Sequence, residues 1–129
     1  MGMTKREVDR KLDNIVAFSE LEEFLSMRLK YFSTGMRARL GFSIMVQAPI
    51  DIILLDEFLA VGDIYFREKC FQVLEGFTRE GKAVILVSQS LGRIARMCTR
   101  AMLLDKGEQV IEGDVHSVVE KYRTLHRDD

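Results

Sequence analysis

At 129 residues the chain is long enough for one compact domain with a hydrophobic core. Hydrophobic residues make up 47% of it and charged residues 30%, with a single proline, a composition typical of globular rather than disordered proteins. The 19 basic and 20 acidic residues nearly cancel, so no overall field would hold the chain on nucleic acid or an anionic membrane. We therefore expect no nucleic-acid partner.

The two cysteines indicate a reducing compartment. Cys70 and Cys98 form no C-x-x-C pair and have no histidine at ligand spacing, so we interpret both as reduced core thiols rather than metal ligands. No apolar run approaches the roughly 20 residues that span a bilayer. Residues 1–6 are not followed by the apolar core of a signal peptide. We expect the chain to stay on the cytoplasmic side of the membrane.

The N-terminal third is expected to be helical. Thr4 and Glu7 have the spacing of a capping box, and the apolar residues after them recur with a helical period. This pattern predicts a helix near residues 5–17. Ser19 and the glutamate three positions later repeat the cap, which predicts a short second helix that ends before Lys30.

Helical and strand patterns alternate in the rest of the chain. The apolar run 52–55 has the length of a strand buried on both faces of a parallel sheet. The other expected elements are helices near 36–47, 66–77, 91–98 and 115–125, and strands at 83–87, 101–104 and 109–112. This order predicts an α/β fold in one domain, with a helical subdomain (1–48) followed by a mainly parallel sheet with helices (49–129).

Two short segments could carry chemistry. Ser33-Thr34-Gly35-Met36 opens a helix with small residues, and a helix N-terminus offers unpaired N–H groups and positive dipole charge to a phosphate. Ser33 or Thr34 could instead be a helix cap alone. Asp56 and Glu57 end the buried strand, and neighbouring strand residues point to opposite faces, so the two carboxylates would have different partners. An ordinary strand ending in solvated acidic residues would look the same.

The order and spacing of four segments resemble the ABC-transporter ATPase domain over nearly the whole chain from about Thr4. Phe32 to Met36 match the signature loop, Ile52 to Glu57 the Walker B strand, Ala60 to Asp63 the D-loop, and Gln89 the position of the switch histidine. The wording F-S-T-G-M-R-A-R-L-G-F and D-E-F-L-A-V-G-D is most similar to subunits that power export of O-antigen, capsular polysaccharide or teichoic acid. The resemblance implies a partial P-loop NTPase fold, with ATP and Mg²⁺ as ligands.

The resemblance also implies roles by position. Two ATPase domains pair head to tail, and the signature loop of one closes on the nucleotide held by the other. The nucleotide-binding residues would be Ser33, Thr34, Gly35 and Met36. Asp56 would position Mg²⁺, and Glu57 would be the general base, with Gln89 beside it in the catalytic site. The D-loop residues at the dimer interface would be Ala60, Val61, Gly62 and Asp63.

Three departures from the family pattern bear on activity. The chain has no Walker A phosphate loop: residues 76–83 fit G-x-x-x-x-G-K but lack the following Ser/Thr and have a helix before and a strand after, the reverse of the required order. Gln89 can hydrogen-bond a phosphate but cannot carry the titratable proton of histidine. Thr34 and Met36 replace the commonest glycine and glutamine of the signature. Arg37 and Arg39, which follow this loop, could contact a phosphate or a carboxylate of a partner, but we interpret them as solvated helix residues.

The leading hypothesis is a partial ATPase subunit of a polysaccharide exporter that is inactive as an isolated chain and binds ATP no tighter than roughly millimolar. Its partners would be a second ABC ATPase domain and a transmembrane permease subunit, at the inner face of the cell membrane. The alternatives are a non-catalytic interaction module that lends its signature loop to a complete partner, and a truncated remnant without function.

Overall fold

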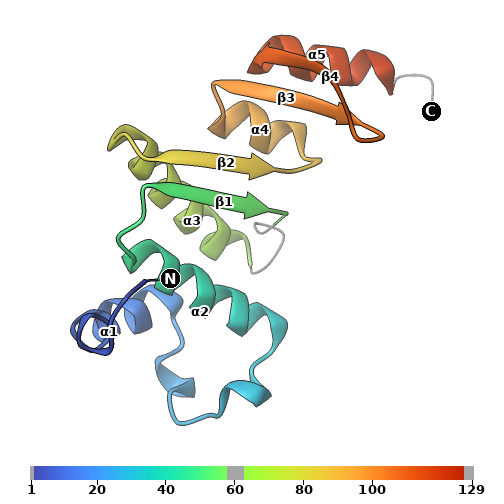
Figure 1. Ribbon diagram of the computed structural model, residues 1–129. Coiled ribbons are helices and arrows are strands. Elements are labelled where there is room, and N and C mark those ends of the chain that lie inside the picture. The colour runs from blue at the N-terminus through green and yellow to red at the C-terminus, as the bar shows by residue number, and fades with distance from the viewer. Residues whose placement is uncertain (1, 58–62, 127–129) are drawn as a thin grey trace. The chain divides into compact units, whose positions relative to one another are not determined.

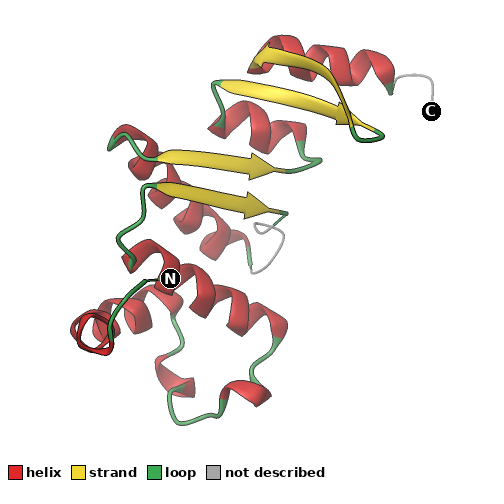
Figure 2. Ribbon diagram, viewed as in Figure 1, coloured by secondary structure: helices red, strands yellow, loops and turns green. Residues whose placement is uncertain are grey.

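The computed structural model describes residues 2–57 and 63–126 (Figure 1). Its elements are, in chain order, α1 (Lys5–Ser19), the 3-10 turns η1 (Glu22–Phe24) and η2 (Leu29–Tyr31), α2 (Thr34–Gln47), β1 (Ile52–Asp56), α3 (Ile64–Arg79), β2 (Ala83–Val87), α4 (Leu91–Met97), β3 (Arg100–Asp105), β4 (Glu108–Asp114) and α5 (Val115–Leu125). Figure 2 shows helices and strands mixed along the chain, which confirms the predicted α/β class. The chain divides into two compact units, residues 1–85 and 86–129.

The first helix begins as predicted and ends in a way that the sequence pattern did not predict. The Thr4 amide donates to Glu7 Oε2 at 2.7 Å and the Thr4 hydroxyl accepts from the Glu7 amide at 3.4 Å, which completes the capping box. Ser19, expected to cap a second helix, instead belongs to the last turn of α1, where its buried hydroxyl donates to the Val16 carbonyl. Glu20 then takes a left-handed conformation (φ 56°), which ends the helix. The predicted cap at Ser19 is therefore wrong, and the short second helix expected before Lys30 is present only as the 3-10 turn η1, which η2 follows.

Three helices build the core of the first unit around aromatic rings. Phe42 of α2 is fully buried and stacks on Phe18 of α1, with ring centroids 5.9 Å apart. Phe66 of α3 meets the Phe18 ring edge-on at 5.9 Å and the Phe42 ring at 6.5 Å. These rings supply apolar area at geometries that aromatic pairs favour. They fix the start of α3 against α1 and α2.

The strands β1 and β2 are hydrogen-bonded neighbours, and their arrows run in the same direction in Figure 1, so they are parallel as predicted. Burial along β1 alternates: Ile53 and Leu55 are 2% and 3% exposed, whereas Ile52 and Leu54 are 63% and 72% exposed. We expected burial on both faces of this strand. Successive side chains of a strand point to opposite faces, so this alternation means that, within the described residues, only one face of β1 is covered.

The second unit contains an antiparallel hairpin and its covering helix. β3 pairs with β4 from Arg100 opposite Asp114 to Asp105 opposite Glu108, with an irregularity between Leu103 and Leu104. The hairpin turn contains Gly107 in the left-handed region (φ 86°), which glycine adopts without steric cost. α5 buries one apolar face made of Val115, Val118 and Val119. These elements confirm the predicted strands and last helix, with β3 two residues and β4 three residues longer than predicted.

Candidate functional site

Burial of Phe32 and the helix cap of Ser33 fix the two residues that precede α2. Phe32 is buried at 9% exposure, and Ser33 has an extended backbone (φ −63°, ψ 164°) as the N-cap of the helix. The Ser33 hydroxyl accepts a hydrogen bond from the Met36 amide at 3.1 Å, and the Ser33 carbonyl accepts from the Arg37 amide at 3.0 Å. Ser33 is thus a true helix cap, which was one of the two interpretations left open by the sequence.

The first turn of α2 nevertheless keeps the features of an anion site. The amides of Thr34 and Gly35 lie ahead of any intrahelical acceptor, and a helix of 14 residues directs positive dipole charge to this end. The first turn contains no acidic residue that would oppose an anion. The turn can therefore receive a phosphate oxygen, and Ser33 can cap the helix at the same time.

The acidic pair lies at the carboxyl end of β1. Asp56 is the last strand residue and is exposed. Glu57 has left the strand, because its φ of 48° is in the left-handed region, which costs a non-glycine residue roughly 1 kcal/mol or more. The chain therefore turns at Glu57, and strand alternation does not determine where its side chain points. Exposed carboxylate oxygens of this kind suit a hard cation such as Mg²⁺.

Of the predicted D-loop residues, Ala60, Val61 and Gly62 lie outside the described residues. Asp63 is described and is the N-cap of α3: its Oδ1 accepts from the Tyr65 amide at 3.0 Å and the Phe66 amide at 2.9 Å. Its Oδ2 accepts a hydrogen bond from Arg39 Nη2. The hydrogen bond from the Phe66 amide, together with the nearby Arg39 charge, holds the pKa of Asp63 below its usual value.

Arg39 is not the solvated helix residue that we expected. Its side chain is only 19% exposed, its Nη1 donates to Glu20 Oε2 at 3.2 Å, and its guanidinium lies 4.7 Å from the centre of the Phe66 ring. The helix that opens with Ser33 is thereby joined to Asp63, through the same arginine that binds the end of α1. Arg37, two residues earlier, is exposed, and its Nη2 donates to the Lys30 carbonyl at 3.3 Å.

The remaining predicted catalytic residue lies in the other unit. Gln89 follows β2 by two residues, and its side chain is exposed. Residues 76–83 run from the helix α3 into the strand β2, the order predicted for this decoy sequence and the reverse of a phosphate loop. Lys82 in that segment pairs with Glu80 at 3.3 Å and lies 4.0 Å from the centre of the Phe77 ring.

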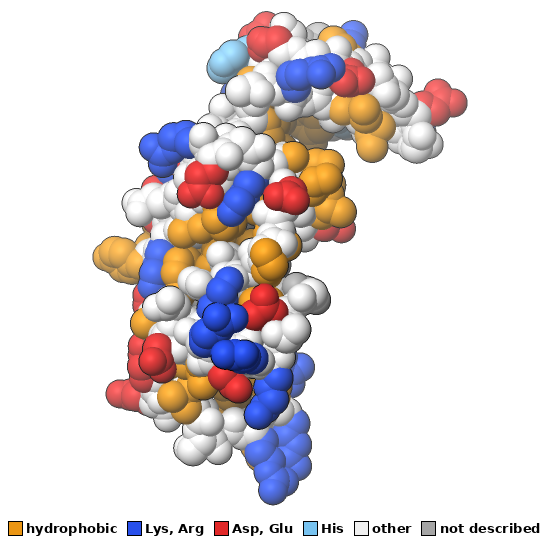
Figure 3. Space-filling model, turned by 60° about the vertical axis from the view of Figure 1, so that its left-hand side comes forward, with side chains coloured by type: hydrophobic (Ala, Val, Ile, Leu, Met, Phe, Trp, Pro, Cys, Tyr) orange, Lys and Arg blue, Asp and Glu red, His pale blue; other side chains and the backbone are white. Residues whose placement is uncertain are grey.

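The thiols and the surface offer no metal centre among the described residues. Cys70 is 1% exposed, and burial raises the pKa of its thiol to about 12, which confirms it as a core residue. Cys98 is partly buried, which also raises its pKa. Within residues 2–57 and 63–126 no cluster of three histidine, cysteine or acidic side chains could hold a metal. On the face drawn in Figure 3, basic and acidic side chains are interspersed.

No family model matches the chain. It is 38% identical over 125 residues to the ABC transporter protein AbcA of Aeromonas salmonicida, covering 97% of this chain and 41% of that protein. It is equally identical over 125 residues to the teichoic acids export ATP-binding protein TagH of Bacillus cereus, of which it covers 23%. The O-antigen export system ATP-binding protein RfbB of Klebsiella pneumoniae is 34% identical over 123 residues, with 95% of this chain and 50% of that protein covered. The chain thus spans half or less of these relatives.

Two solved structures share the fold. The ATP-binding subunit of an ABC transporter superposes with a TM-score of 0.79 at 19% identity, over 94% of this chain and 50% of that one. The ATP-binding cassette MJ0796, a dimer in a post-hydrolysis state with ADP and Pi, gives 0.71 at 25% identity over 89% and 50% of the two chains. The fold is therefore that of an ABC ATPase domain. The relatives above, 34–38% identical over most of this chain, are ABC transporter proteins, two of them named as export ATP-binding proteins, and the chain spans only a part of their length.

No helix among the described residues is both long and apolar enough to cross a membrane.

Proposed function

We propose that this chain supplies the signature-loop side of an ATP site shared between two ABC ATPase domains, and that the assembly drives polysaccharide export. The observation that carries the proposal is the start of α2. There, amides without intrahelical acceptors and the Ser33 hydroxyl open a helix free of acidic residues in its first turn. The teichoic acid and O-antigen export relatives, at 38% and 34% identity, support the same assignment.

The nucleotide contacts would come from the first turn of α2. The four proposed residues, which would face the γ-phosphate of ATP held by a second domain, are Ser33, Thr34, Gly35 and Met36. Backbone N–H groups at a helix N-terminus bind phosphate oxygens without needing a charged side chain. The Met36 amide already donates to the Ser33 hydroxyl. Thr34 and Gly35 would therefore provide the free donors, and Ser33 would set their direction.

The acidic pair at the end of β1 would serve this chain's own half of the dimer. Mg²⁺, when bound, would neutralise charge on the phosphate oxygens. Asp56, exposed at the strand end, is the residue that would hold it, and Glu57 would accept a proton from the attacking water. Gln89 would hydrogen-bond a phosphate oxygen, and because its amide does not titrate we expect slower hydrolysis than with histidine. Asp63 would lie at the dimer interface.

The partners follow from the family. We propose a second ABC ATPase domain, paired head to tail, and a transmembrane permease subunit, which together place the chain on the inner face of the cell membrane. The ABC dimer with ADP and Pi supports the pairing, and the names of the teichoic acid and O-antigen relatives support the class of cargo.

The test is to mix the chain with the complete ATP-binding protein of a relative, such as RfbB of the O-antigen export system, and to measure ATP turnover. We expect turnover to change with the concentration of the wild-type chain until the effect saturates, and Ser33→Arg to abolish the change because the added side chain fills the phosphate position. Ser33→Ala loses the same helix cap without adding bulk and should keep part of the effect. Ser117→Arg places the same side chain on the exposed face of α5 and should act like wild type. An unchanged turnover with the wild-type chain would contradict the proposal.

A further inference from the structure

Asp63 has a second set of contacts in addition to those of a helix cap. One carboxylate oxygen accepts the two amides at the start of α3, and the other accepts from Arg39 of α2. Arg39 also donates to Glu20, the residue that ends α1, and its guanidinium lies over the Phe66 ring. The Arg39 side chain, from the middle of α2, therefore contacts both the end of α1 and the start of α3.

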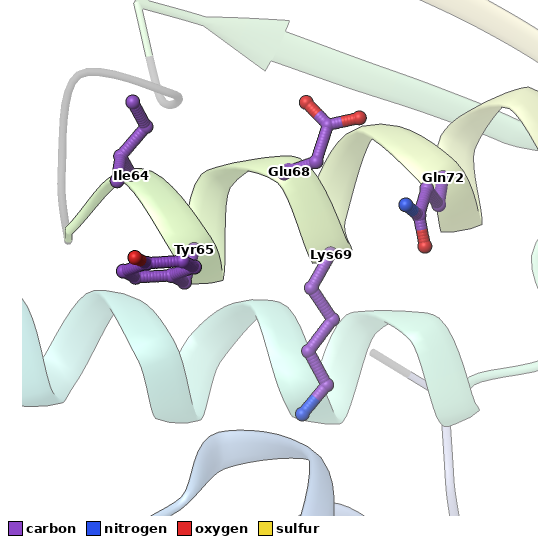
Figure 4. A pocket seen from close by; sticks show the side chains of 5 residues that line it. All are labelled: Ile64, Tyr65, Glu68, Lys69 and Gln72. Carbon is purple, nitrogen blue, oxygen red and sulfur yellow. The ribbon is translucent and has the colours of Figure 1, made fainter.

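A second cation completes this arrangement. Lys69 of α3 donates to Glu20 Oε1 and to the Phe18 carbonyl, both at 3.0 Å, and lies 4.6 Å from the centre of the Phe18 ring. In Figure 4 its side chain extends from α3 across α2, whereas Glu68 points the opposite way. Glu20 is thus bound by Arg39 through one oxygen and by Lys69 through the other. The ion pairs rest on the Phe18 and Phe66 rings, which exclude water from one side of each cation.

The position of Arg39 along α2 gives this network a connection to the signature loop. Arg39 follows Ser33 by six residues, which is roughly 9 Å along a helix that rises 1.5 Å per residue. Ser33 caps the continuous helix that contains Arg39, so a displacement of the helix N-terminus would also displace the guanidinium. The guanidinium in turn holds Asp63 Oδ2.

We propose that Arg39 is a positioning residue of the ATP site, which ties Asp63 to the helix that begins at Ser33 so that phosphate contact and dimer interface shift together. The inference rests on the proposed function for its consequence, while the coupling between the two residues can be measured in the chain alone. Arginine is required because its planar fork can serve two carboxylates and a ring at once, whereas lysine has a single charged nitrogen on a flexible stem.

The coupling is tested by amide hydrogen exchange, followed by NMR, in the full chain. In Arg39→Met we expect the Tyr65 and Phe66 amides to exchange roughly three- to tenfold faster, because Asp63 keeps its cap but loses the charged partner that fixes it. Arg39→Lys should fall between. Asp63→Asn, which retains an acceptor for the cap but not the ion pair, should match Arg39→Met, and the double variant should add little more. Arg37→Met, the same change two residues away, is the matched control and should leave both amides unaffected.

The consequence for the site is read in the mixed turnover assay, with far-UV circular dichroism confirming equal folding of the variants. We expect Arg39→Met and Asp63→Asn each to raise the chain concentration for half-maximal effect by roughly three- to tenfold, with no further rise in the double variant. Unchanged exchange in Arg39→Met, or additive effects in the double variant, would overturn the positioning role. A wild-type chain without effect on turnover would instead contradict the proposed function and leave the exchange result to decide the coupling.

Discussion

The aromatic core of the first unit makes a strong prediction about stability. Phe42 is fully buried between Phe18 and Phe66, which belong to the two helices on either side of it. Phe42→Ala removes the ring from both contacts and leaves a cavity that three helices must close around. Phe-to-Ala changes at such sites cost about 3–5 kcal/mol in the free energy of unfolding. Because small proteins have only about 5–15 kcal/mol in total, we expect a large shift.

Urea unfolding monitored by far-UV circular dichroism measures this change. If the free energy of unfolding falls by about 2 kcal/mol per molar urea, the urea midpoint for unfolding of the first unit should fall by roughly 2 M. Leu25→Ala, at a side chain that is 63% exposed, is the control and should stay within about 0.5 kcal/mol of wild type. A Phe42→Ala chain destabilised by less than about 1 kcal/mol would refute the packing described for α1, α2 and α3.

Three further predictions concern caps and thiols. Thr4→Ala should destabilise the chain by about 1 kcal/mol in the same urea experiment, because it removes the capping box of α1; no loss would mean that α1 contributes nothing to the cooperative fold. Hydrogen bonds from Thr4 lower the pKa of Glu7, and the hydrogen bond from the Phe66 amide lowers the pKa of Asp63. The two ionised carboxylates therefore stabilise the fold fully above the ordinary carboxyl range, and this stabilisation is lost as the pH falls through the lowered pKa values. Unfolding free energy should therefore decrease below about pH 4, and less steeply in Thr4→Ala with Asp63→Asn. Cys70, buried and with a pKa raised to about 12, should react with a thiol reagent only at the rate of unfolding, and more slowly than Cys98; equal rates would contradict its burial.

Most elements of the fold could be predicted from local pattern, since caps and apolar periods act within a few residues. The capping box at Thr4 predicted α1 because its two partners are three residues apart. The same pattern failed at Ser19, where burial of the hydroxyl and the left-handed Glu20 made the residue an end rather than a start. The prediction that β1 is buried on both faces was also wrong. An apolar run shows that both faces of a strand could be covered, but it does not show whether other elements cover them.

The candidate site was predictable where its residues are contiguous and not where distant segments meet. The helix cap at Ser33 could be predicted, because a serine before a helical stretch is a local signal. Arg39 could not, because its acidic partners are 19 and 24 residues away along the chain. One signal was present: Arg39 precedes the buried Phe42 by three residues and so shares its helix face, whereas Arg37 points elsewhere. That spacing distinguishes the two arginines before any contact is known.

The central claim is that the first turn of α2 completes an ATP site on a second ABC ATPase domain. Sedimentation of this chain with a complete ATPase domain of a relative, with and without ATP, tests it most directly. We predict a complex that forms with ATP, weakens without it and is lost in Ser33→Arg. Equal association with and without nucleotide, or a complex that Ser33→Arg leaves intact, would contradict the claim.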